Sequence, residues 1–209
     1  MSAPAAALPE TAARVPALCP GGVVVCLAGG PSITSAQLAA VRGRVDAVIA
    51  INSSYRAAPW ADVLYACDAR WWRLERGAPS FTGHKFALEP GAAHWPGVVV
   101  LRTTGHEGLE TDPRGVRTGR NSGYQAINVA VHLGARRVIL LGYDMTIGPD
   151  GRRHHYDAPP SLLPFRMWLQ HFETIVAPLA ALGVEVINCS PRSALRVFPC
   201  RPLEEVLPC

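Results

Sequence analysis

Six short apolar runs alternate along the chain with stretches of helical periodicity. The runs cover residues 23–27, 47–51, 63–67, 98–101, 138–141 and 184–187. Their hydrophobic residues are continuous rather than alternating with polar ones, which is typical of strands that are covered on both faces. Helices are expected over about 32–41, 68–76, 121–134 and 162–182. Strands that alternate with helices predict an α/β fold, namely a single Rossmann-like domain with a mainly parallel central sheet and helices on both faces.

Length and composition indicate one domain. A chain of 209 residues fits one ordinary domain with a sizeable core. Residues 1–20 are rich in Ala and Pro and lack the features of a signal peptide, so we expect a flexible N-terminal arm there and a single domain over 21–209. No apolar run approaches the roughly 20 residues that span a bilayer. We therefore expect no membrane span and a cytoplasmic location.

Charge and cysteine usage exclude several classes of protein. Hydrophobic residues make up 49% of the chain and charged residues 17%, so the composition is that of a globular protein rather than a disordered one. The net charge of +4 is modest and the basic residues are scattered, which does not favour nucleic-acid binding as the main role. The six cysteines form no CxxC pair, so they predict neither a zinc site nor a redox site.

Small, polar and acidic residues follow the predicted strands. In a doubly wound sheet, ligands bind beyond the carboxyl ends of the strands. The residues in that position are Gly29, Gly30, Pro31, Ser32, Asn52, Ser53, Ser54, Asp68, Tyr143 and Asp144, and all but Ser54 are assigned to the nucleotide site. A glycine turn brings backbone amides close to a phosphate, although a tight strand-to-helix turn without a ligand explains it equally well. The pattern predicts a nucleotide site, and it is neither a GxGxxG nor a Walker motif.

The best helix of the chain opens with Asn121, Ser122 and Gly123. A helix N-terminus is positive and suits an anionic ligand, and a glycine leaves the approach to it open. The alternative is an N-cap without a ligand, followed by a solvated polar stripe, and we apply that interpretation to Asn128 and His132. The preceding segment, 103–120, is polar and long for a loop, which makes it a candidate lid or binding loop.

A second polar cluster follows the strand at 138–141. Arg152 and Arg153 could hold a phosphate, and His154 or His155 could act as a general base. An exposed polar loop is the alternative. The histidine spacing is not one that binds a metal, and Asp144 forms no DxD motif, so no metal ligand is assigned. Trp71 and Trp72 are expected to pack a helix, and residues 188–195 either close the same site or form a turn.

Four of these blocks together resemble a known group of proteins. They are Gly29–Ser32, Ile51–Ser54, Asn121–Ile127 and Leu133–Asp144. The group joins bacterial lipooligosaccharide sialyltransferases to an uncharacterised Rossmann-like family that contains the archaeal 6-hydroxymethylpterin diphosphokinase. The chain is most similar to phage and prophage members of that family, and the resemblance covers about residues 22 to 200.

The resemblance implies roles for individual residues. In the sialyltransferases the matching positions hold a cytidine monophosphate donor, and here they are Gly30, Pro31, Ser32, Asn52, Ser122 and Gly123. A His-Tyr pair supplies the base there, which implies His155 followed by Tyr156 in this chain. Such enzymes need no metal, so no cofactor is expected. The family turn often reads Gly-Asn-Gly-Pro-Ser, whereas this chain has Ala28-Gly29-Gly30 and lacks the asparagine side chain.

Three functional hypotheses follow. The first is a glycosyltransferase-like enzyme with a nucleotide-linked sugar donor, such as a CMP-linked one, in which His155 is the base and Arg152 or Arg153 stabilises the phosphate. The second is a diphosphokinase that uses ATP and Mg²⁺, with Asp68 and Asp144 as metal contacts. The third is a phage protein that binds a nucleotide without catalysis. The acceptor stays open between a glycan, a modified DNA base and a small molecule, as does a homo-oligomer.

Overall fold

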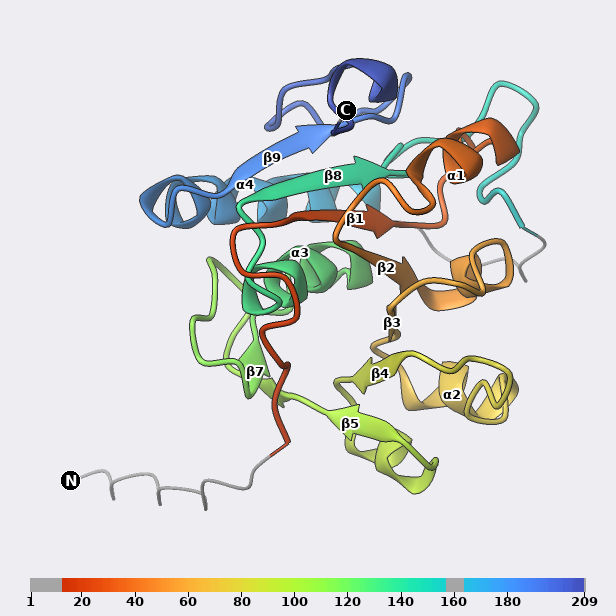
Figure 1. Cartoon of the computed structure of the whole chain (residues 1–209), viewed down its shortest axis with the longest axis vertical. Helices are drawn as coiled ribbons and strands as arrows, with labels where there is room; N and C mark the ends of the chain where they lie inside the picture. Colours follow the sequence, from red (N-terminus) through yellow and green to blue (C-terminus); the bar gives the residue numbers. More distant parts are fainter. Residues whose placement is uncertain (1–12, 157–163, 209) are drawn as a thin grey trace.

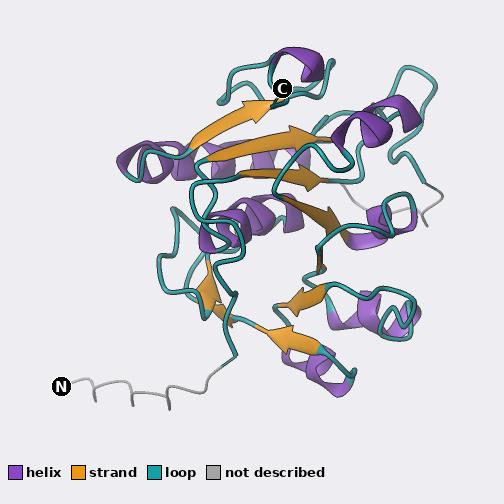
Figure 2. Cartoon of the chain, viewed as in Figure 1, coloured by secondary structure: helices purple, strands orange, loops and turns teal. Residues whose placement is uncertain are grey.

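A single seven-stranded sheet forms the centre of the molecule (Figures 1 and 2). The computed structural model describes residues 13–156 and 164–208. In sequence order the strands of this sheet are β1 (Val23–Leu27), β2 (Ala47–Ile51), β3 (Val63–Tyr65), β4 (His84–Ala87), β5 (Val98–Val100), β8 (Arg137–Leu141) and β9 (Glu185–Asn188). Their order in space is β5-β4-β3-β2-β1-β8-β9, and every neighbouring pair is parallel. The predicted α/β fold with a parallel central sheet is confirmed.

Helices cover both faces of the sheet. They are α1 (Ser35–Val41), α2 (Ala69–Leu74), α3 (Ser122–His132) and α4 (Phe165–Ala181), with the 3₁₀ turns η1 (Asn52–Arg56), η2 (Pro90–His94) and η3 (Leu203–Glu205). Val24 and Cys26 of β1 point into a core shared with α3 and α4, whereas Val25 points into a second core shared with α1 and α2. All five residues of β1 are buried, as expected for a strand covered on both faces.

Element boundaries differ from the sequence predictions in places with a physical cause. The first helix starts three residues later than expected, because Thr34 and Gln37 form a capping box that fixes its N-terminus. The expected helix over 162–182 is α4, although residues 162 and 163 lie outside the described part. Strand β4 was not predicted, because its sequence, HKFA, begins with two polar residues and has no apolar run. It is found only through its pairing with β3 and β5.

The last residues before β1 are packed rather than free. Val15 is buried, and its N–H donates to Pro113 O at 2.9 Å. The N–H groups of Cys19 and Gly21 donate to Leu133 O and Gly134 O at 2.9 and 2.8 Å. The structure thus differs from the expected flexible arm over residues 13–20, while residues 1–12 lie outside the described part. In the described part of the chain no helix has the length and apolarity to cross a membrane.

The 103–120 loop is held against α3 by polar side chains of that helix. It begins in β6 (Arg102–Thr103) and contains β7 (Gly115–Val116), and these two form a small parallel sheet. Asn128 accepts hydrogen bonds from the N–H groups of Glu110 and Arg117 at 3.0 and 3.1 Å, and donates to Glu110 O at 2.9 Å. His132 Nε2 donates to Gly115 O at 2.8 Å.

The expectation that Asn128 and His132 form a solvated stripe is therefore wrong. Their exposed fractions are 0% and 9%. The helical period shows that polar residues share a face of α3, but it does not show whether water or a polar loop covers that face. Here the loop supplies backbone N–H and C=O groups, and buried polar groups of this kind need partners.

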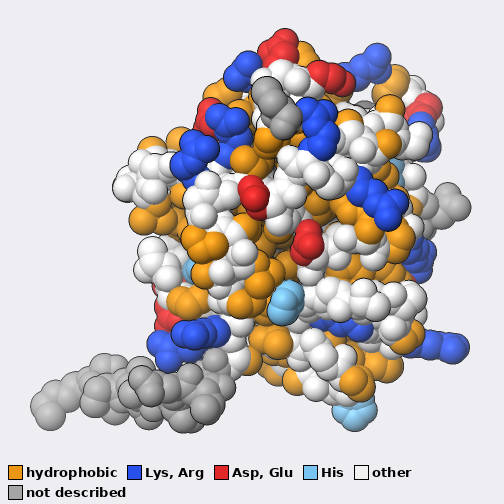
Figure 3. Space-filling view, in the orientation of Figure 1, with side chains coloured by type: hydrophobic (Ala, Val, Ile, Leu, Met, Phe, Trp, Pro, Cys, Tyr) orange, Lys and Arg blue, Asp and Glu red, His pale blue; other side chains and the backbone are white. Residues whose placement is uncertain are grey.

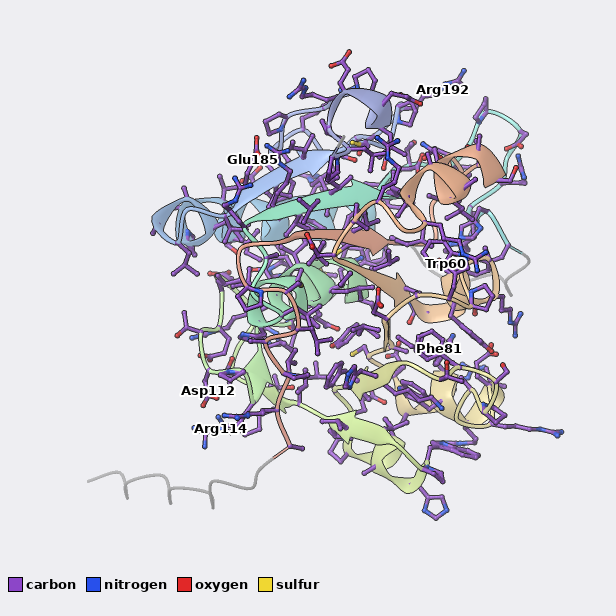
Figure 4. All side chains as sticks on the ribbon, in the orientation of Figure 1. Trp60, Phe81, Asp112, Arg114, Glu185 and Arg192 are labelled. Carbon is purple, nitrogen blue, oxygen red and sulfur yellow. The ribbon has the colours of Figure 1, made fainter. Side chains whose placement is uncertain are left out.

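Charge is dispersed over the surface. On the face that Figure 3 shows, basic and acidic side chains are interspersed with hydrophobic ones. Arg114 and Asp112 of the 103–120 loop form an ion pair at 2.8 Å, and Figure 4 shows them side by side. This distribution agrees with the modest net charge.

Candidate functional site

The candidate site lies where the chain order reverses in the sheet. From β1 the sheet continues to β2 on one side and to β8 on the other, and the carboxyl ends of these strands share one edge (Figure 1). Such a switch point leaves a crevice in which α/β proteins bind ligands. The turn at 28–32 leaves β1 there, Asn52 begins η1 after β2, and Asp144 follows β8.

The glycine turn is fixed to the end of β8. Gly30 N–H donates to Gly142 O at 2.9 Å, and Ser32 Oγ donates to Asp144 Oδ2 at 2.9 Å. A Cβ on Gly30 would collide with the Asp144 carboxylate and with Gly142 O, so only glycine fits there. Burial raises the pKa of Asp144, while the hydrogen bond from Ser32 lowers it. Gly30 therefore has a structural role, and its N–H is not free to bind a phosphate.

The 145–156 loop returns from β8 and places its last residues on the same turn. His155 N–H donates to Gly29 O at 3.0 Å. A Cβ on Gly29 would come within 2.7 Å of Tyr156 Oη and 3.0 Å of His154 Nδ1. The rings of His154 and Tyr156 are stacked at 5.2 Å with an interplanar angle of 7°. Two motifs that lie far apart in the sequence, the glycine turn and the His-Tyr pair, are thus brought into direct contact.

His155 is neutral at physiological pH. Burial and, to a smaller extent, the neighbouring His154 lower its pKa to about 4. Burial also raises the pKa of Tyr156 to about 12. An imidazole in this state can accept a proton, whereas the phenol keeps its own. The geometry is compatible with His155 as a general base.

Ser54 follows the second strand, as the sequence indicated, but it was not among the residues chosen for the nucleotide site. Its hydroxyl lies 3.1 Å from His155 Nε2 and 3.0 Å from Ala28 O. The neighbouring Ser53, which was selected instead, accepts a hydrogen bond from Trp71 Nε1 at 3.2 Å and faces α2. The strand end Asn52-Ser53-Ser54 indicated hydroxyl groups at this place, but the first turn of η1 decides which of them turns inward.

Asn52 carries two marks of a ligand site. Its φ is 52°, a left-handed conformation that costs energy for a residue with a side chain. Its Oδ1 is buried and has no hydrogen-bond partner among the described residues. A buried acceptor without a donor costs about 1–3 kcal/mol. A ligand with an N–H or O–H group would remove that cost.

The start of α3 is only partly available to a ligand. Asn121 Oδ1 caps the helix by accepting from the N–H groups of Gly123 and Tyr124 at 2.8 and 3.1 Å. Gly123 is buried, and its carbonyl accepts a hydrogen bond from Tyr143 Oη at 2.9 Å. Tyr143 is itself fully buried, so the structure does not bring its side chain to the site surface. Ser122 and Asn121 are both half-buried, and Asn121 Oδ1 is already engaged in the helix cap.

The remaining predicted residues lie at the margins of the site. Asp68 precedes α2 without capping it, and burial and Glu89 raise its pKa. Arg152 and Arg153 are exposed on the 145–156 loop, where Arg152 pairs with Asp150 at 2.5 Å.

A pocket of about 300 Å³ lies between the glycine turn and the 145–156 loop. It is lined by Pro31, Ser32, Asp144, Thr146, Ile147, Gly148, Pro149, Asp150, Arg152, Pro191 and Arg192. Small-molecule sites typically have volumes of about 300–1,000 Å³, so this pocket is at the lower end of that range. Arg192 extends beyond the ends of β8 and β9 (Figure 4). The segment after β9 thus helps to close the site, one of the two alternatives for residues 188–195.

The two carboxylates proposed for Mg²⁺ are far apart. Asp68 follows β3 and Asp144 follows β8, and β2 and β1 lie between these strands. With strands about 4.8 Å apart, the strand ends are separated by about 14 Å. One Mg²⁺ binds its ligands at about 2.1 Å, so these two residues cannot share an ion. Among the described residues no group of three or more His, Cys, Asp or Glu side chains could hold a metal ion.

Comparisons with known proteins give structural relatives only. No family model and no curated protein matches the sequence. The glycosyltransferase Maf from Magnetospirillum magneticum AMB-1 matches with a TM-score of 0.63 and 12% identity, over 93% of this chain and 36% of that one. The sialyltransferase CstII from Campylobacter jejuni, in complex with the substrate analogue cytidine-5′-monophosphate, matches with a TM-score of 0.52 and 13% identity.

The second match covers 88% of this chain and 87% of that one, whereas this chain spans about a third of the Magnetospirillum protein. At these identities the likeness concerns the fold. The protein thus shares its α/β fold with these two solved structures. A relation to the pterin diphosphokinase and a phage origin stay predictions from the sequence.

Proposed function

We propose that this protein is a glycosyltransferase that takes a sugar from a nucleotide-linked donor and uses His155 as its general base. One observation carries the proposal: a neutral histidine is hydrogen-bonded through its backbone to the glycine turn at the switch point of the sheet. The resemblance of the sequence and the CMP bound to the structural relative support a nucleotide donor.

The donor would lie along the carboxyl ends of β1, β2 and β8. The pocket beside Ser32 and Asp144 has room for a base or a sugar. The unpartnered Oδ1 of Asn52 would accept a hydrogen bond from a donor hydroxyl, and Ser122 at the start of α3 would face the phosphate. Arg152 and Arg153 would approach the phosphate from the 145–156 loop.

The reaction needs one proton transfer. His155 would take the proton of an acceptor hydroxyl while that oxygen forms a bond to the sugar carbon. The bond between that carbon and the phosphate oxygen breaks, and the nucleotide leaves with both electrons as an anion. The positive N-terminus of α3 would stabilise this charge. His155 later returns its proton to water.

Ligand binding provides the first test, because it requires no knowledge of the acceptor. Thermal unfolding is measured with CMP, UMP, AMP, GMP and ATP, each with EDTA and with Mg²⁺. A nucleotide at 100 times its Kd raises the free energy of unfolding by about 2.7 kcal/mol. We expect a pyrimidine nucleotide to stabilise the protein equally well in EDTA. Stabilisation by ATP alone, and only with Mg²⁺, would favour the diphosphokinase and contradict the proposal.

Turnover provides the second test. With water as acceptor, a glycosyltransferase slowly hydrolyses its donor, and release of the nucleotide is measured for a panel of nucleotide sugars. We expect hydrolysis of one of them by the wild type. Saturable binding of a nucleotide without any turnover would support the non-catalytic alternative instead.

A further inference from the structure

The Ser54 hydroxyl has one proton and two neighbours. Ala28 O, at 3.0 Å, is a carbonyl and can only accept a hydrogen bond. His155 Nε2, at 3.1 Å, either donates or accepts according to which ring nitrogen carries the hydrogen. The position of the Ser54 proton therefore determines the tautomer of His155.

Burial decides where that proton goes. Ser54 is fully buried, so no water replaces a missing partner. If Ser54 donated to Nε2, the carbonyl of the half-buried Ala28 would lose this donor, and a polar group left without its partner costs up to about 1–3 kcal/mol when water does not reach it. If Ser54 donates to Ala28 O, its oxygen accepts from Nε2–H and all three groups are paired. The second arrangement is the more stable one.

We infer that Ser54 is a positioning residue that holds His155 in the Nε2–H tautomer and leaves Nδ1 as the proton acceptor. This inference rests on the proposed role of His155 as a base. The ring contact of His155 to Ser54 is made through Nε2, and no described residue forms a hydrogen bond with Nδ1. The backbone bond from His155 N–H to Gly29 O fixes the residue from the other side.

A different role for Ser54 is a nucleophile activated by histidine, because serine hydrolases use the same Oγ–Nε2 contact. Two features of the structure oppose it. Ser54 has no exposed surface that a substrate could reach. Its proton goes to Ala28 O rather than to the imidazole, so the histidine does not activate the hydroxyl. Labelling of Ser54 by a fluorophosphonate would overturn the positioning role.

The tautomer can be observed directly in the free protein. Long-range ¹H–¹⁵N spectra of ¹⁵N-histidine-labelled protein at pH 7 distinguish protonated from unprotonated ring nitrogens, and the His155→Gln spectrum assigns the signals. We expect Nε2 protonated and Nδ1 unprotonated. In Ser54→Ala the two tautomers become mixed, because Nε2–H loses its acceptor. In Ser193→Ala the His155 signals stay unchanged. Ser193 is a matched control, since it is equally buried and donates to the Tyr143 carbonyl.

Several polar and titratable groups surround His155 and can affect the signals of its ring nitrogens. They are His154 and Tyr156 in its own loop and Ser54 from η1, while Arg56 and Glu75 act on Tyr156. Spectra of His154→Gln separate the signals of the adjacent ring. A wild-type His155 that is protonated on Nδ1, or on both nitrogens, at pH 7 overturns the inference. This result does not depend on whether the protein transfers a sugar.

Kinetics give the second readout once a donor is known. Ser54→Ala should lower kcat by about 10- to 100-fold with little change in KM, as when a residue that orients a catalytic group is removed. Ser54→Thr keeps the hydroxyl and should restore most of the rate. An unchanged kcat in a folded Ser54→Ala protein overturns the positioning role. A wild type that hydrolyses no donor contradicts the proposed function, while the tautomer spectrum still decides the placement of the proton.

Discussion

The 103–120 loop and the 145–156 loop differ in how they are held, although both are polar and glycine-containing. Buried side chains of α3 hold the first through bonds to Glu110, Gly115 and Arg117. Within the described part of the second, His155 is bonded to Gly29 and the ring of Tyr156 contacts His154 and His155, and an exposed Arg152–Asp150 pair precedes them. The segment predicted as a candidate lid or binding loop is thus packed against α3, and the other loop carries the candidate chemistry.

The difference shows that polarity alone does not distinguish a structural loop from a functional one. In the 103–120 loop the backbone groups of Glu110, Gly115 and Arg117 are paired with side chains of α3, and only Arg117 Nε is a buried polar atom without a partner among the described residues. At the site, Asn52 Oδ1 lacks a partner and Nδ1 of His155 is free among the described residues. Unpaired polar atoms are the better sign of a ligand site where they lie at the carboxyl ends of the strands around the switch point.

The largest expected effect is that of His155→Ala on turnover. Loss of a general base lowers kcat by about 10²–10⁴-fold. The thermal midpoint should change little, because the 145–156 loop contributes few buried contacts. The exposed His94→Ala variant is the control and should keep full activity. Full turnover of the His155→Ala protein would contradict the assignment of the candidate chemistry to the 145–156 loop.

Asn128→Leu tests the other loop. It leaves the N–H groups of Glu110 and Arg117 and the Glu110 carbonyl without partners, and each such buried group costs about 1–3 kcal/mol. We expect the free energy of unfolding, from urea titration, to fall by about 3 kcal/mol, and the folded protein to keep its kcat. Asp150→Ala, which breaks the exposed pair in the 145–156 loop, should not change stability. Equal losses of unfolding free energy in Asn128→Leu and Asp150→Ala would contradict the conclusion that the two loops are held differently.

Gly29→Ala tests how closely the His-Tyr pair must approach the turn. The new methyl group would lie 2.7 Å from Tyr156 Oη and 3.0 Å from His154 Nδ1, so the end of the 145–156 loop must move. A small misplacement of catalytic groups costs up to about 10²-fold in rate, and we expect about a 10-fold fall in kcat/KM. The thermal midpoint should change by no more than a few degrees. Gly91→Ala is the control, because its nearest neighbour is only the Ala69 methyl group.

The smallest effect is on the pH dependence of stability. Burial lowers the pKa of His132 below the ordinary value of 6.5. The unfolded chain therefore binds more protons than the folded one below about pH 6.5, so stability is complete above that value and falls as the pH is lowered. His154 and His155 have lowered pKa values as well and act in the same direction. His132→Gln should reduce the slope of unfolding free energy against pH between 6.5 and 5, and an unchanged slope would contradict this assignment.

The fold was accessible from the sequence because buried parallel strands leave a clear pattern. Continuous runs such as Val23–Leu27 need both faces covered, and this alone indicates the layers of helices. Strand β4 was missed, since its inclusion in the sheet depends on its neighbours and not on its own residues. The burial of Asn128 under the 103–120 loop was missed for a related reason. The helical period shows which residues share a face of a helix, but not what covers that face.

The sequence predicted which segments form the site, but not which residues of each segment face it. The glycine turn, Asn52 and His155 do come together at one edge of the sheet, as their positions after strands predict. The choice between adjacent residues was not accessible. Ser54 rather than Ser53 faces His155, and Tyr143 turns into the core, because the rotation of the backbone at each strand end is set by tertiary packing.

The placement of β1 has a consequence for how the chain is made. β1 is a central strand, with Val24 paired to Ala47 on one side and to Val138 on the other. On the ribosome the first partner emerges soon after β1, but the second emerges only when most of the chain has been synthesised. One edge of β1 therefore stays open during translation and exposes backbone groups that other chains could pair with. Contacts that close so late slow folding, so we expect the nascent chain to depend on a chaperone until β8 has emerged.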